Sequence, residues 1–183
     1  MKGIKPSYSG FLAIFRNILT NQFNYTKILI PADESNNMKT KKLPFKEFKS
    51  IYSQVPRLCV ELIIKNKQGI LLTKRNIEPL RGKWHIPGGT ILMGENTEQA
   101  VKRISWEELG IKVEVKKLLG VVEYKIDKYF SQPIGLAFLV KAIQPQNIHL
   151  DPQASQFKFF KRIPKNAVKE QRLFLNKQLI KKM

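Results

Sequence analysis

Residues 88–111 read GGTILMGENTEQAVKRISWEELGI, and this stretch decides the fold. A glycine pair leaves a strand, a short acidic turn follows, and apolar positions then recur at the spacing of an amphipathic helix that we expect over residues 97–109. Gly110 follows the last apolar position of that helix, where a left-handed residue commonly ends a helix. The stretch therefore predicts a strand, a turn and a helix in succession.

The last turns of this helix carry charged side chains in a pattern that suits a cation site. Glu107 and Glu108 are adjacent carboxylates near a helix C-terminus, where their mutual repulsion and the helix dipole disfavour them. Arg103 lies four residues before Glu107, close enough to pair with it. A hard cation such as Mg²⁺ would remove the penalty because it prefers oxygen ligands. The carbonyls of Gly88 and Gly89 could complete its shell, since glycine lets the backbone approach closely.

The same stretch resembles the Nudix box, Gly-x5-Glu-x7-Arg-Glu-apolar-x-Glu-Glu-x-Gly-apolar. The positions that match it are Gly89, Glu95, Arg103, Glu107, Glu108, Gly110 and Ile111. The departures are Ile104, where the box has Glu, and Ser105, where it has an apolar residue. The resemblance implies an α/β Nudix fold, an α/β/α sandwich with a mixed sheet. It also implies a Mg²⁺-dependent hydrolase, for which Mn²⁺ can substitute, acting on a small-molecule nucleoside diphosphate derivative. A surface helix with a charged face is the alternative, which the fixed spacing disfavours.

The resemblance covers roughly residues 43–175 and looks most like the GDP-mannose mannosyl hydrolase branch. It includes a helix that holds Phe48, paired strands, Lys74-Arg75, and the sequence Pro87-Gly88-Gly89. What this branch implies is hydrolysis of a nucleotide sugar by water that attacks the sugar carbon, with Mg²⁺ on the leaving diphosphate.

Carried over position by position, the branch implies that the metal is held by the carbonyl of Gly88, by Glu108 and by Gln153 from a late loop. Glu107 matches a metal ligand of the wider Nudix family, and Arg103 would hold its rotamer. A glutamine in a loop also commonly meets only solvent, which is the simpler explanation of Gln153.

The branch also implies two substrate contacts. Arg75 would bind the diphosphate and stabilise the charge that grows on it as the bond breaks. Phe48 would lie against the nucleotide. The structural alternatives are a strand-end cation in water for Arg75 and a core position for Phe48.

The groups that handle protons depart from both patterns. Ile104 replaces the glutamate that activates or orients water in ordinary Nudix pyrophosphatases. Ala154 stands where the branch has a histidine, and Thr90 stands where it has an arginine. Glu61, which aligns with an acidic substrate contact of the branch, is the first candidate for a replacement base. The other candidate carboxylates are Glu123, Asp127 and Asp151.

Composition excludes several other classes of protein. A single cysteine, Cys59, excludes an intramolecular disulfide framework and a cysteine-cluster zinc site. The 33 Lys and Arg against 14 Asp and Glu give a net charge of +19, with the excess mainly at the two ends. Because the basic residues are mostly lysines without interleaved aromatics, we expect a solvated surface rather than a nucleic-acid partner. No stretch reaches the roughly 18 apolar residues that span a bilayer, so we expect a cytoplasmic protein without membrane contact.

The chain divides into an extension and one domain. Residues 1–37 show weak periodicity and end in a polar linker, which indicates a loosely attached extension or an upstream start chosen too early. Residues 38–183 form the Nudix domain, with the box at residues 89–111. A homodimer is the assembly that the family suggests.

Further elements are expected around the box. The apolar face of a helix that begins near Pro44 would contain Phe45, Phe48, Ile51 and Tyr52. The expected strands cover residues 58–64, 70–73, 113–122, 134–142 and 157–161, and a terminal helix is expected over residues 167–181.

Three hypotheses about function remain open. The first is a hydrolase of a nucleotide sugar, and a Nudix pyrophosphatase that attacks phosphorus is its enzymatic alternative. The second is a Nudix module that binds a nucleotide or nucleotide sugar without turnover, which the missing base favours. The third is nucleic-acid association through the basic ends, which would make RNA binding steeply dependent on salt.

Overall fold

The computed structural model describes residues 41–125, 130–143 and 147–180. The predictions about residues 1–37 and about Asp127 lie outside the described residues. The strands are β1 (Arg57–Asn66), β2 (Gly69–Arg75), β3 (Trp84–His85), β4 (Gly88–Thr90), β5 (Val113–Glu123), β6 (Pro133–Ala142) and β7 (Ala154–Phe160). The helices are α2 (Phe45–Tyr52), α3 (Thr97–Leu109) and α4 (Lys169–Ile180).

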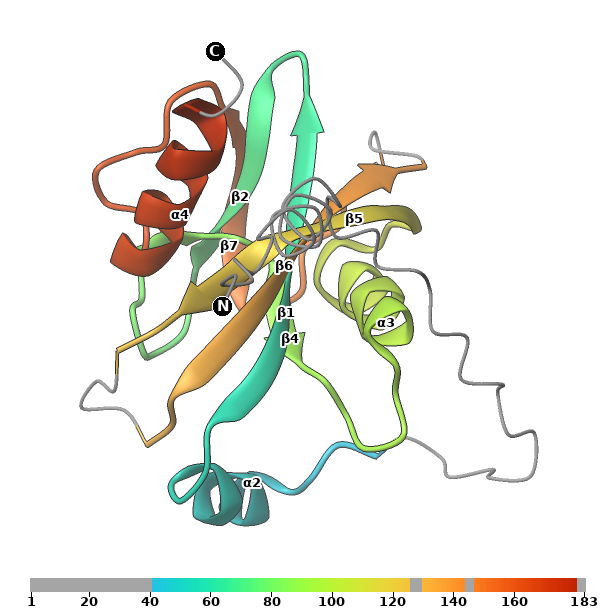
Figure 1. Cartoon of the computed structure of the whole chain (residues 1–183), viewed down its shortest axis with the longest axis vertical. Helices are drawn as coiled ribbons and strands as arrows, with labels where there is room; N and C mark the ends of the chain where they lie inside the picture. The colour runs from blue at the N-terminus through green and yellow to red at the C-terminus, as the bar shows by residue number, and fades with distance from the viewer. Residues whose placement is uncertain (1–40, 126–129, 144–146, 181–183) are drawn as a thin grey trace, which may run out of the picture. The chain divides into compact units, whose positions relative to one another are not determined.

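The strands form a mixed sheet between α3 and α4. Its order is β3-β2-β1-β6-β5, with β4 paired to β1 and β7 paired to β2. The pair β1–β6 is parallel, and the other pairs are antiparallel. Figure 1 shows α3 and α4 on opposite sides of the sheet, and each helix has its own buried apolar cluster against it. The predicted α/β/α sandwich with a mixed sheet is therefore confirmed.

Strand β1 separates the core from the site because its side chains alternate between two faces. Val60, Leu62 and Ile64 point into the cluster beneath α3 and are almost completely buried. On the opposite face, Arg57 and the residues at positions 59 and 61 line a cleft. The central strand thus builds the core with one face and the floor of the candidate site with the other.

Local signals at both ends determine the length of α3. Asn96 accepts a hydrogen bond from the backbone N–H of Gln99, and the Gln99 side chain accepts one from the backbone N–H of Asn96. This reciprocal pair is a capping box. At the other end Gly110 has φ of 64°, and its N–H donates to the carbonyl of Trp106. The predicted bounds and the predicted left-handed cap are confirmed.

Ser105, which departs from the apolar residue of the box, has a structural role. Its side chain is completely buried, and its hydroxyl donates to the carbonyl oxygen of Ile111 at 2.9 Å. That bond provides the carbonyl with a donor just after the helix ends, where backbone acceptors lack helical partners. The serine therefore replaces apolar packing with a hydrogen bond that ties the end of α3 to the following turn.

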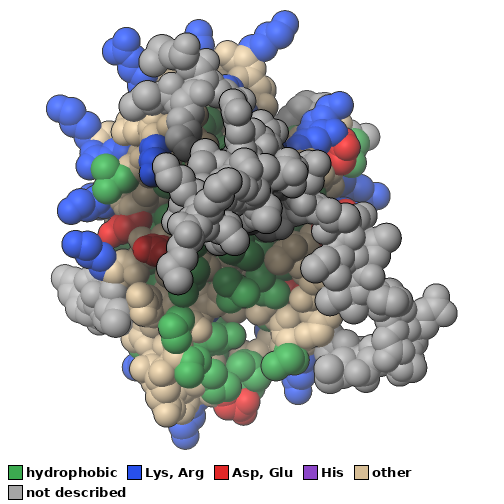
Figure 2. Space-filling model, viewed as in Figure 1, with side chains coloured by type: hydrophobic (Ala, Val, Ile, Leu, Met, Phe, Trp, Pro, Cys, Tyr) green, Lys and Arg blue, Asp and Glu red, His purple; other side chains and the backbone are tan. Residues whose placement is uncertain are grey.

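Several boundaries and one surface differ from the expectations. Helix α4 begins at Lys169, and β7 begins at Ala154, three residues earlier than expected. Helix α2 begins at Phe45, and none of its residues is buried. Figure 2 shows hydrophobic side chains gathered around α2 at the lower edge of the molecule. The exposed apolar residues in and beside this helix are Leu43, Phe45, Ile51, Val55 and Leu58.

No helix within the described ranges is both long and apolar enough to cross a membrane.

Candidate functional site

A cleft of about 910 Å³ brings together the site residues that the sequence predicts. Its walls come from β1, β4, the end of α3, the loop that follows β2, and residues 165–172. All eight candidates line it: Phe48, Glu61, Arg75, Gly88, Arg103, Glu107, Glu108 and Gln153. Residues that are far apart in the sequence therefore line one cleft.

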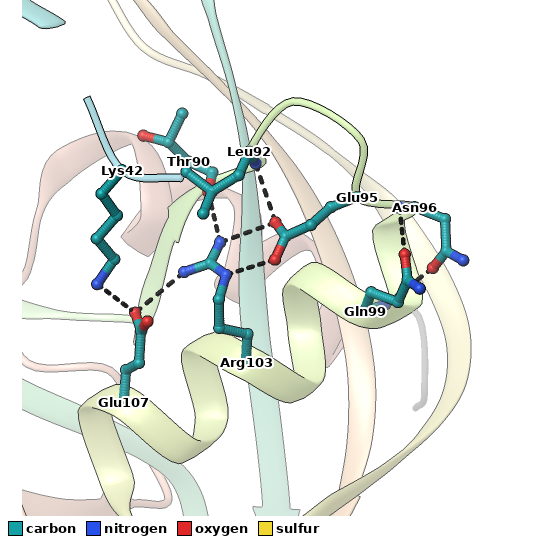
Figure 3. A network of polar contacts seen from close by, with 8 residues as sticks. All are labelled: Lys42, Thr90, Leu92, Glu95, Asn96, Gln99, Arg103 and Glu107. Carbon is teal, nitrogen blue, oxygen red and sulfur yellow. Dashed lines mark hydrogen bonds and ion pairs between the residues drawn. The ribbon is translucent and has the colours of Figure 1, made fainter. Parts of the chain in front are cut away.

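Arg103 is the centre of a polar network beside the cleft (Figure 3). Its Nε and Nη2 donate to the two carboxylate oxygens of Glu95, at 2.5 and 3.0 Å. Nη2 also donates to the carbonyl of Thr90, and the backbone N–H of Leu92 completes the shell of Glu95. Through these bonds Arg103 ties α3 to the turn that leads from β4 into the helix. Its Nη1 reaches Glu107 at 3.0 Å, which confirms the predicted pairing.

The two adjacent carboxylates of α3 have different surroundings. Glu107 is one-third exposed, and its Oε2 accepts bonds from Arg103 and, at 2.8 Å, from Lys42. Glu108 turns inward and accepts a bond from the N–H of Gly88 at 3.2 Å. Burial, together with the negative charges of Asp151 and Glu61, raises the pKa of Glu108 to about 8.

These surroundings fit a divalent cation at Gly88 and Glu108. A buried carboxylate that faces other carboxylates gains from a nearby positive charge, and the donors here are oxygens of the kind that hard cations prefer. Within the described ranges, no three Asp, Glu, His or Cys side chains gather closely enough to hold a metal by themselves. A cation here would therefore depend on backbone, water or substrate oxygens for the rest of its shell. Glu107 already has two cationic partners.

Glu61 lies at the floor of the cleft, where it is 5% exposed. Its Oε1 accepts a hydrogen bond from the Tyr124 hydroxyl at 2.5 Å, and its Oε2 accepts one from Nε2 of Gln171 at 3.0 Å. The same Nε2 donates to the Tyr124 oxygen at 2.7 Å, while the Gln171 carbonyl oxygen accepts from the N–H of Ile86. The hydrogen bonds from Tyr124 and Gln171 lower the pKa of Glu61, but burial outweighs them and raises it to about 8.

Two glycines make room for the Glu61 carboxylate. A Cβ on Gly88 would lie 2.9 Å from its Oε2, and a Cβ on Gly135 would lie 2.7 Å from its Cγ. Gly88 is therefore close to both Glu61 and Glu108. Sequence reasoning did not find Tyr124 and Gln171, which hold Glu61. Neither residue belongs to a local motif. Tyr124 directly follows β5, and Gln171 lies on α4.

The remaining candidates have partners of their own. Gln153 is exposed, and its amide donates to Asp151 at 2.9 Å. Arg75 Nε donates to the carbonyl of Pro79 at 2.7 Å, which anchors the loop after β2. Phe48 is half-buried and packs edge-on against Phe130. The structure thus places both substrate-contact candidates on the cleft wall.

Of the other candidate bases that the structure describes, Glu123 is exposed on β5 and Asp151 is bonded to Gln153. Neither lines the cleft. Ile104 is 2% exposed and packs against Gly89, so its position in the box belongs to the core. Trp106, the residue between Ser105 and Glu107, is 60% exposed and does not line the cleft.

The pKa values of Glu61 and Glu108 predict how the metal-free protein responds to pH. Each rises from an ordinary value of 4.5 to about 8. Their stabilising contribution is therefore complete below about pH 4.5 and is lost as the pH rises through 8. His85 has the opposite trend, because burial and Arg75 lower its pKa from 6.5 to about 4. The melting temperature in chelator should consequently fall between pH 6.5 and 8.5, which lies above the pH range in which the shifted pKa of His85 changes stability.

The control for this prediction is a pair of Glu→Gln substitutions. Glu108→Gln should flatten the fall in melting temperature, because the amide stays neutral and its oxygen can still accept from Gly88. Glu47→Gln, on the exposed surface of α2, should leave the fall unchanged. A wild-type melting temperature that stays constant over this range in chelator would contradict the prediction.

Comparison with known proteins identifies the family. The model of the NUDIX domain matches residues 55–177. The chain is 35% identical over 137 residues to the low-salt glycan biosynthesis protein Agl8 of Haloferax volcanii, which covers 70% of this chain and 87% of that one. It is 32% identical over 120 residues to an ADP-ribose pyrophosphatase of Methanocaldococcus jannaschii, covering 64% of this chain and 70% of the relative.

Solved structures agree with this family. The MutT NUDIX hydrolase of Burkholderia pseudomallei superposes with a TM-score of 0.60 at 29% identity, over 67% of this chain and 97% of that one. A MutT protein of Methanosarcina mazei has the same fold, with a TM-score of 0.62 at 21% identity, over 69% of this chain and 96% of that one. The domain match, the relatives and the Arg103-centred helix facing a cleft all lead to one conclusion: the chain belongs to the Nudix family and is a Nudix hydrolase.

Proposed function

We propose that this Nudix hydrolase cleaves a nucleoside diphosphate sugar with Mg²⁺, by attack of water on the sugar carbon. The observation that carries the proposal is the pair of carboxyls next to Gly88 in the cleft, the buried Glu61 and the half-buried Glu108. One carboxyl of such a pair can bind a cation while the other handles a proton. The relative named for glycan biosynthesis supports a sugar-linked substrate.

The cation would be held by Glu108 and by the backbone oxygen of Gly88. Gln153 could join them by giving up its bond to Asp151, since its side chain is exposed. Bound there, Mg²⁺ would supply positive charge to the diphosphate as it leaves. Glu107 would serve chiefly to keep Arg103 in place.

Cationic side chains on the cleft wall would bind the diphosphate. Arg75 lies close enough to Glu108 to lower the pKa of that carboxyl. Lys83 and Lys165 line the same cleft. Positive charges at these positions attract a diphosphate and stabilise it most when the bond to the sugar has broken.

Glu61 would take the proton of the attacking water. Tyr124 and Gln171 each donate to one of its oxygens, so the carboxylate is fixed in orientation and keeps lone pairs for another donor. A pKa raised by burial makes this carboxylate a stronger base than an exposed one. As the water oxygen bonds to the anomeric carbon, its proton passes to Glu61 and the electron pair of the broken bond leaves with the diphosphate.

Attack on phosphorus is the second candidate, favoured by the relative named as an ADP-ribose pyrophosphatase and by Glu107 on the cleft wall. One experiment distinguishes attack on carbon from attack on phosphorus. A panel of nucleotide sugars is incubated with the enzyme and Mg²⁺ in ¹⁸O-labelled water, and the products are analysed by mass spectrometry. We expect the label in the free sugar. Label in the phosphate would establish the pyrophosphatase, and binding without turnover would establish a binding module.

Glu61→Gln provides the matched test of the base. It should lower the rate of sugar release by about 10²–10⁴-fold, the usual loss when a general base is removed. Glu123→Gln, on the exposed surface of β5, should leave that rate unchanged. A Glu61→Gln enzyme with full activity would show that the proton goes elsewhere.

A further inference from the structure

One wall of the cleft is built where β3 runs beside the segment that leads into α4. The backbone N–H of Trp84 donates to the carbonyl of Asn166 at 3.4 Å, and the N–H of Val168 donates to the carbonyl of Trp84 at 2.8 Å. Lys83 and Lys165 precede the paired residues in these two segments, and both line the cleft. The pairing therefore places two lysines on the same wall.

The first turn of α4 adds two more cations to this wall. Lys169 and Arg172 line the cleft, and residues three apart lie on the same face of a helix. Nη1 of Arg172 donates to the carbonyl of Lys165 at 2.9 Å, which holds the side chain of this half-buried arginine in place. A guanidinium has five N–H donors, so this bond leaves others for an acceptor in the cleft. We call Lys83, Lys165, Lys169 and Arg172 the α4 wall.

The α4 wall has little negative charge to balance it. Among the described residues, none of its four cations forms an ion pair. The segment from residue 165 to residue 172 contributes one carboxylate to the cleft, that of Glu170. The part of the cleft beside α3 differs, because Lys42 and Arg103 there both bind Glu107. Like charges that are held together without such partners attract an anion.

The α4 wall borders the expected places of both the diphosphate and the sugar. The carbonyl of Lys83 accepts a bond from the N–H of Arg75 at 3.0 Å, which places this lysine near the diphosphate. Gln171 belongs to the same turn of α4 as Arg172 and donates to Glu61 at 3.0 Å. Because Glu61 is the proposed base for attack on the sugar carbon, the sugar would lie beside this turn.

The positive charge of the α4 wall exceeds what a diphosphate requires. Mg²⁺ in such sites binds substrate phosphates directly, and Arg75, Lys83 and Lys165 add cations near the same group. Lys169 and Arg172 then remain without a counter-charge beside the sugar. A neutral sugar would leave these two charges facing each other, whereas an anionic one would pair with them.

We propose that the sugar of the substrate carries an anionic substituent, a carboxylate or a sulfate or phosphate ester, which Arg172 binds with help from Lys169. The planar fork of a guanidinium matches two oxygens of such a group, and charged hydrogen bonds of this kind are stronger than neutral ones. This inference rests on the proposed function for the place of the sugar beside Glu61.

A nucleic acid is the other anion that a basic wall binds, and the surroundings disfavour it. Single-stranded nucleic acids are held by cationic grooves together with aromatic side chains on which the bases stack. The α4 wall consists of cations alone, and the neighbouring Trp84 packs edge-on against Phe160 at 4.8 Å. A compact anion on a sugar therefore fits the wall better than an extended chain of nucleotides.

Matched pairs of nucleotide sugars test this inference. UDP-glucuronic acid differs from UDP-glucose by a carboxylate, as GDP-mannuronic acid does from GDP-mannose. UDP-N-acetylgalactosamine 4-sulfate differs from its parent by a sulfate. Dissociation constants are measured by calorimetry on the full chain in chelator, so that no metal-dependent turnover consumes the ligand. A short single-stranded RNA is the competing ligand, and the release of sugar with Mg²⁺ is measured separately.

Four variants accompany the wild type. Arg172→Met keeps the apolar stem, Arg172→Lys keeps the charge, and Lys169→Met removes the exposed partner on the same helix face. Lys177→Met is the control, because Lys177 is exposed on α4 and does not line the cleft. Melting temperatures establish that each variant folds.

We expect the acidic member of at least one pair to bind about tenfold more tightly than its neutral partner, the size of a hydrogen bond between charged groups. Added salt should reduce this ratio of dissociation constants, because it screens charges near the surface. Arg172→Met should bring the ratio close to one, and Lys169→Met should lower it by a smaller factor. Arg172→Lys should retain part of the ratio, because a lysine lacks the planar fork. Lys177→Met should keep the whole of it.

The pair that shows the preference identifies the substituent. A preference in the carboxylate pairs alone indicates a uronic acid, and a preference in the sulfated pair alone indicates an ester. Equal affinities within every pair would overturn the inference, as would a ratio that Arg172→Met and Lys169→Met both leave unchanged. Absence of binding by every nucleotide sugar would overturn it too. RNA that binds more tightly than each acidic sugar, and that Arg172→Met releases, would assign the wall to a nucleic acid.

The inference and the proposed function fail in different ways. Preferential binding of an acidic sugar in chelator, without release of sugar when Mg²⁺ is added, would keep the assignment of Arg172 and reject the proposed function. Release of neutral and acidic sugars at equal rates, with equal affinities, would keep the proposed function and reject the assignment.

Discussion

Replacing Glu108 with glutamine should lower Mg²⁺-dependent turnover by about a thousandfold or more while the protein remains folded. The substitution removes the negative charge that would hold the cation, and a metal contributes several kcal/mol of charge stabilisation in the transition state. The fold should persist because the amide oxygen can accept the bond that Gly88 donates. The metal-free variant should also lose the repulsion between Glu108, Asp151 and Glu61.

Two measurements check this prediction. One is kcat/KM with Mg²⁺ on the substrate that the labelled-water experiment identifies. The other is the rise in melting temperature that Mg²⁺ produces, which any ligand that binds only the folded state should cause. Glu108→Gln should lose both, and Glu123→Gln should keep both. Full activity in Glu108→Gln would show that this carboxylate does not hold the metal.

The parts of the fold that could be predicted are those whose signals are local. Helix α3 has the expected bounds because Asn96, Gln99 and Gly110 specify its ends within one turn of each terminus. The interior of β1 could be predicted because its apolar run fills two buried faces. The bounds of a helix and the interior of a strand depend on residues close together in the sequence, so they can be predicted from it.

The parts that could not be predicted depend on contacts between distant segments. Glu61 meets Tyr124 and Gln171 only because β5 and α4 converge on β1, with sequence separations of 63 and 110 residues. Arg57 likewise lies over the ring of Phe48, which belongs to α2, only because the chain folds. No regular spacing in the sequence links these residues. The Nudix box therefore indicated where the cleft lies, but not which residues surround Glu61 at its floor.

Arg103 of the box has one more carboxylate partner than the sequence predicted. The sequence paired Arg103 with Glu107, and the structure adds Glu95, whose side chain is only 4% exposed. Glu107 is exposed enough for water to compensate its charge. Glu95 has no such access, so the Arg103–Glu95 pair contributes most of the stability at this point.

Arg103→Met should therefore destabilise the domain strongly. It leaves the buried Glu95 carboxylate with the Leu92 N–H as its remaining partner in the network. Breaking a buried pair by removing one member costs about 3–5 kcal/mol, and each kcal/mol shifts the melting temperature of a domain this size by about 2–4 °C. The expected loss is roughly 10 °C. Differential scanning calorimetry at pH 7 measures it, with Lys102→Met on the exposed face of α3 as the control.

A double variant and a pH series show whether the buried charge is the cause. Burial opposes the ionisation of Glu95, but its bonds from Arg103 and Leu92 lower its pKa below the ordinary 4.5. The pair's contribution is therefore present above pH 4.5 and is lost as the pH falls through the folded-state pKa. The difference between wild type and Arg103→Met should shrink in acid for that reason. Adding Glu95→Gln to Arg103→Met should recover part of the loss at pH 7, since the amide removes the uncompensated charge. A double variant as unstable as the sum of both singles would mean that Arg103 and Glu95 act independently, and that Arg103 stabilises α3 through Thr90 and Glu107.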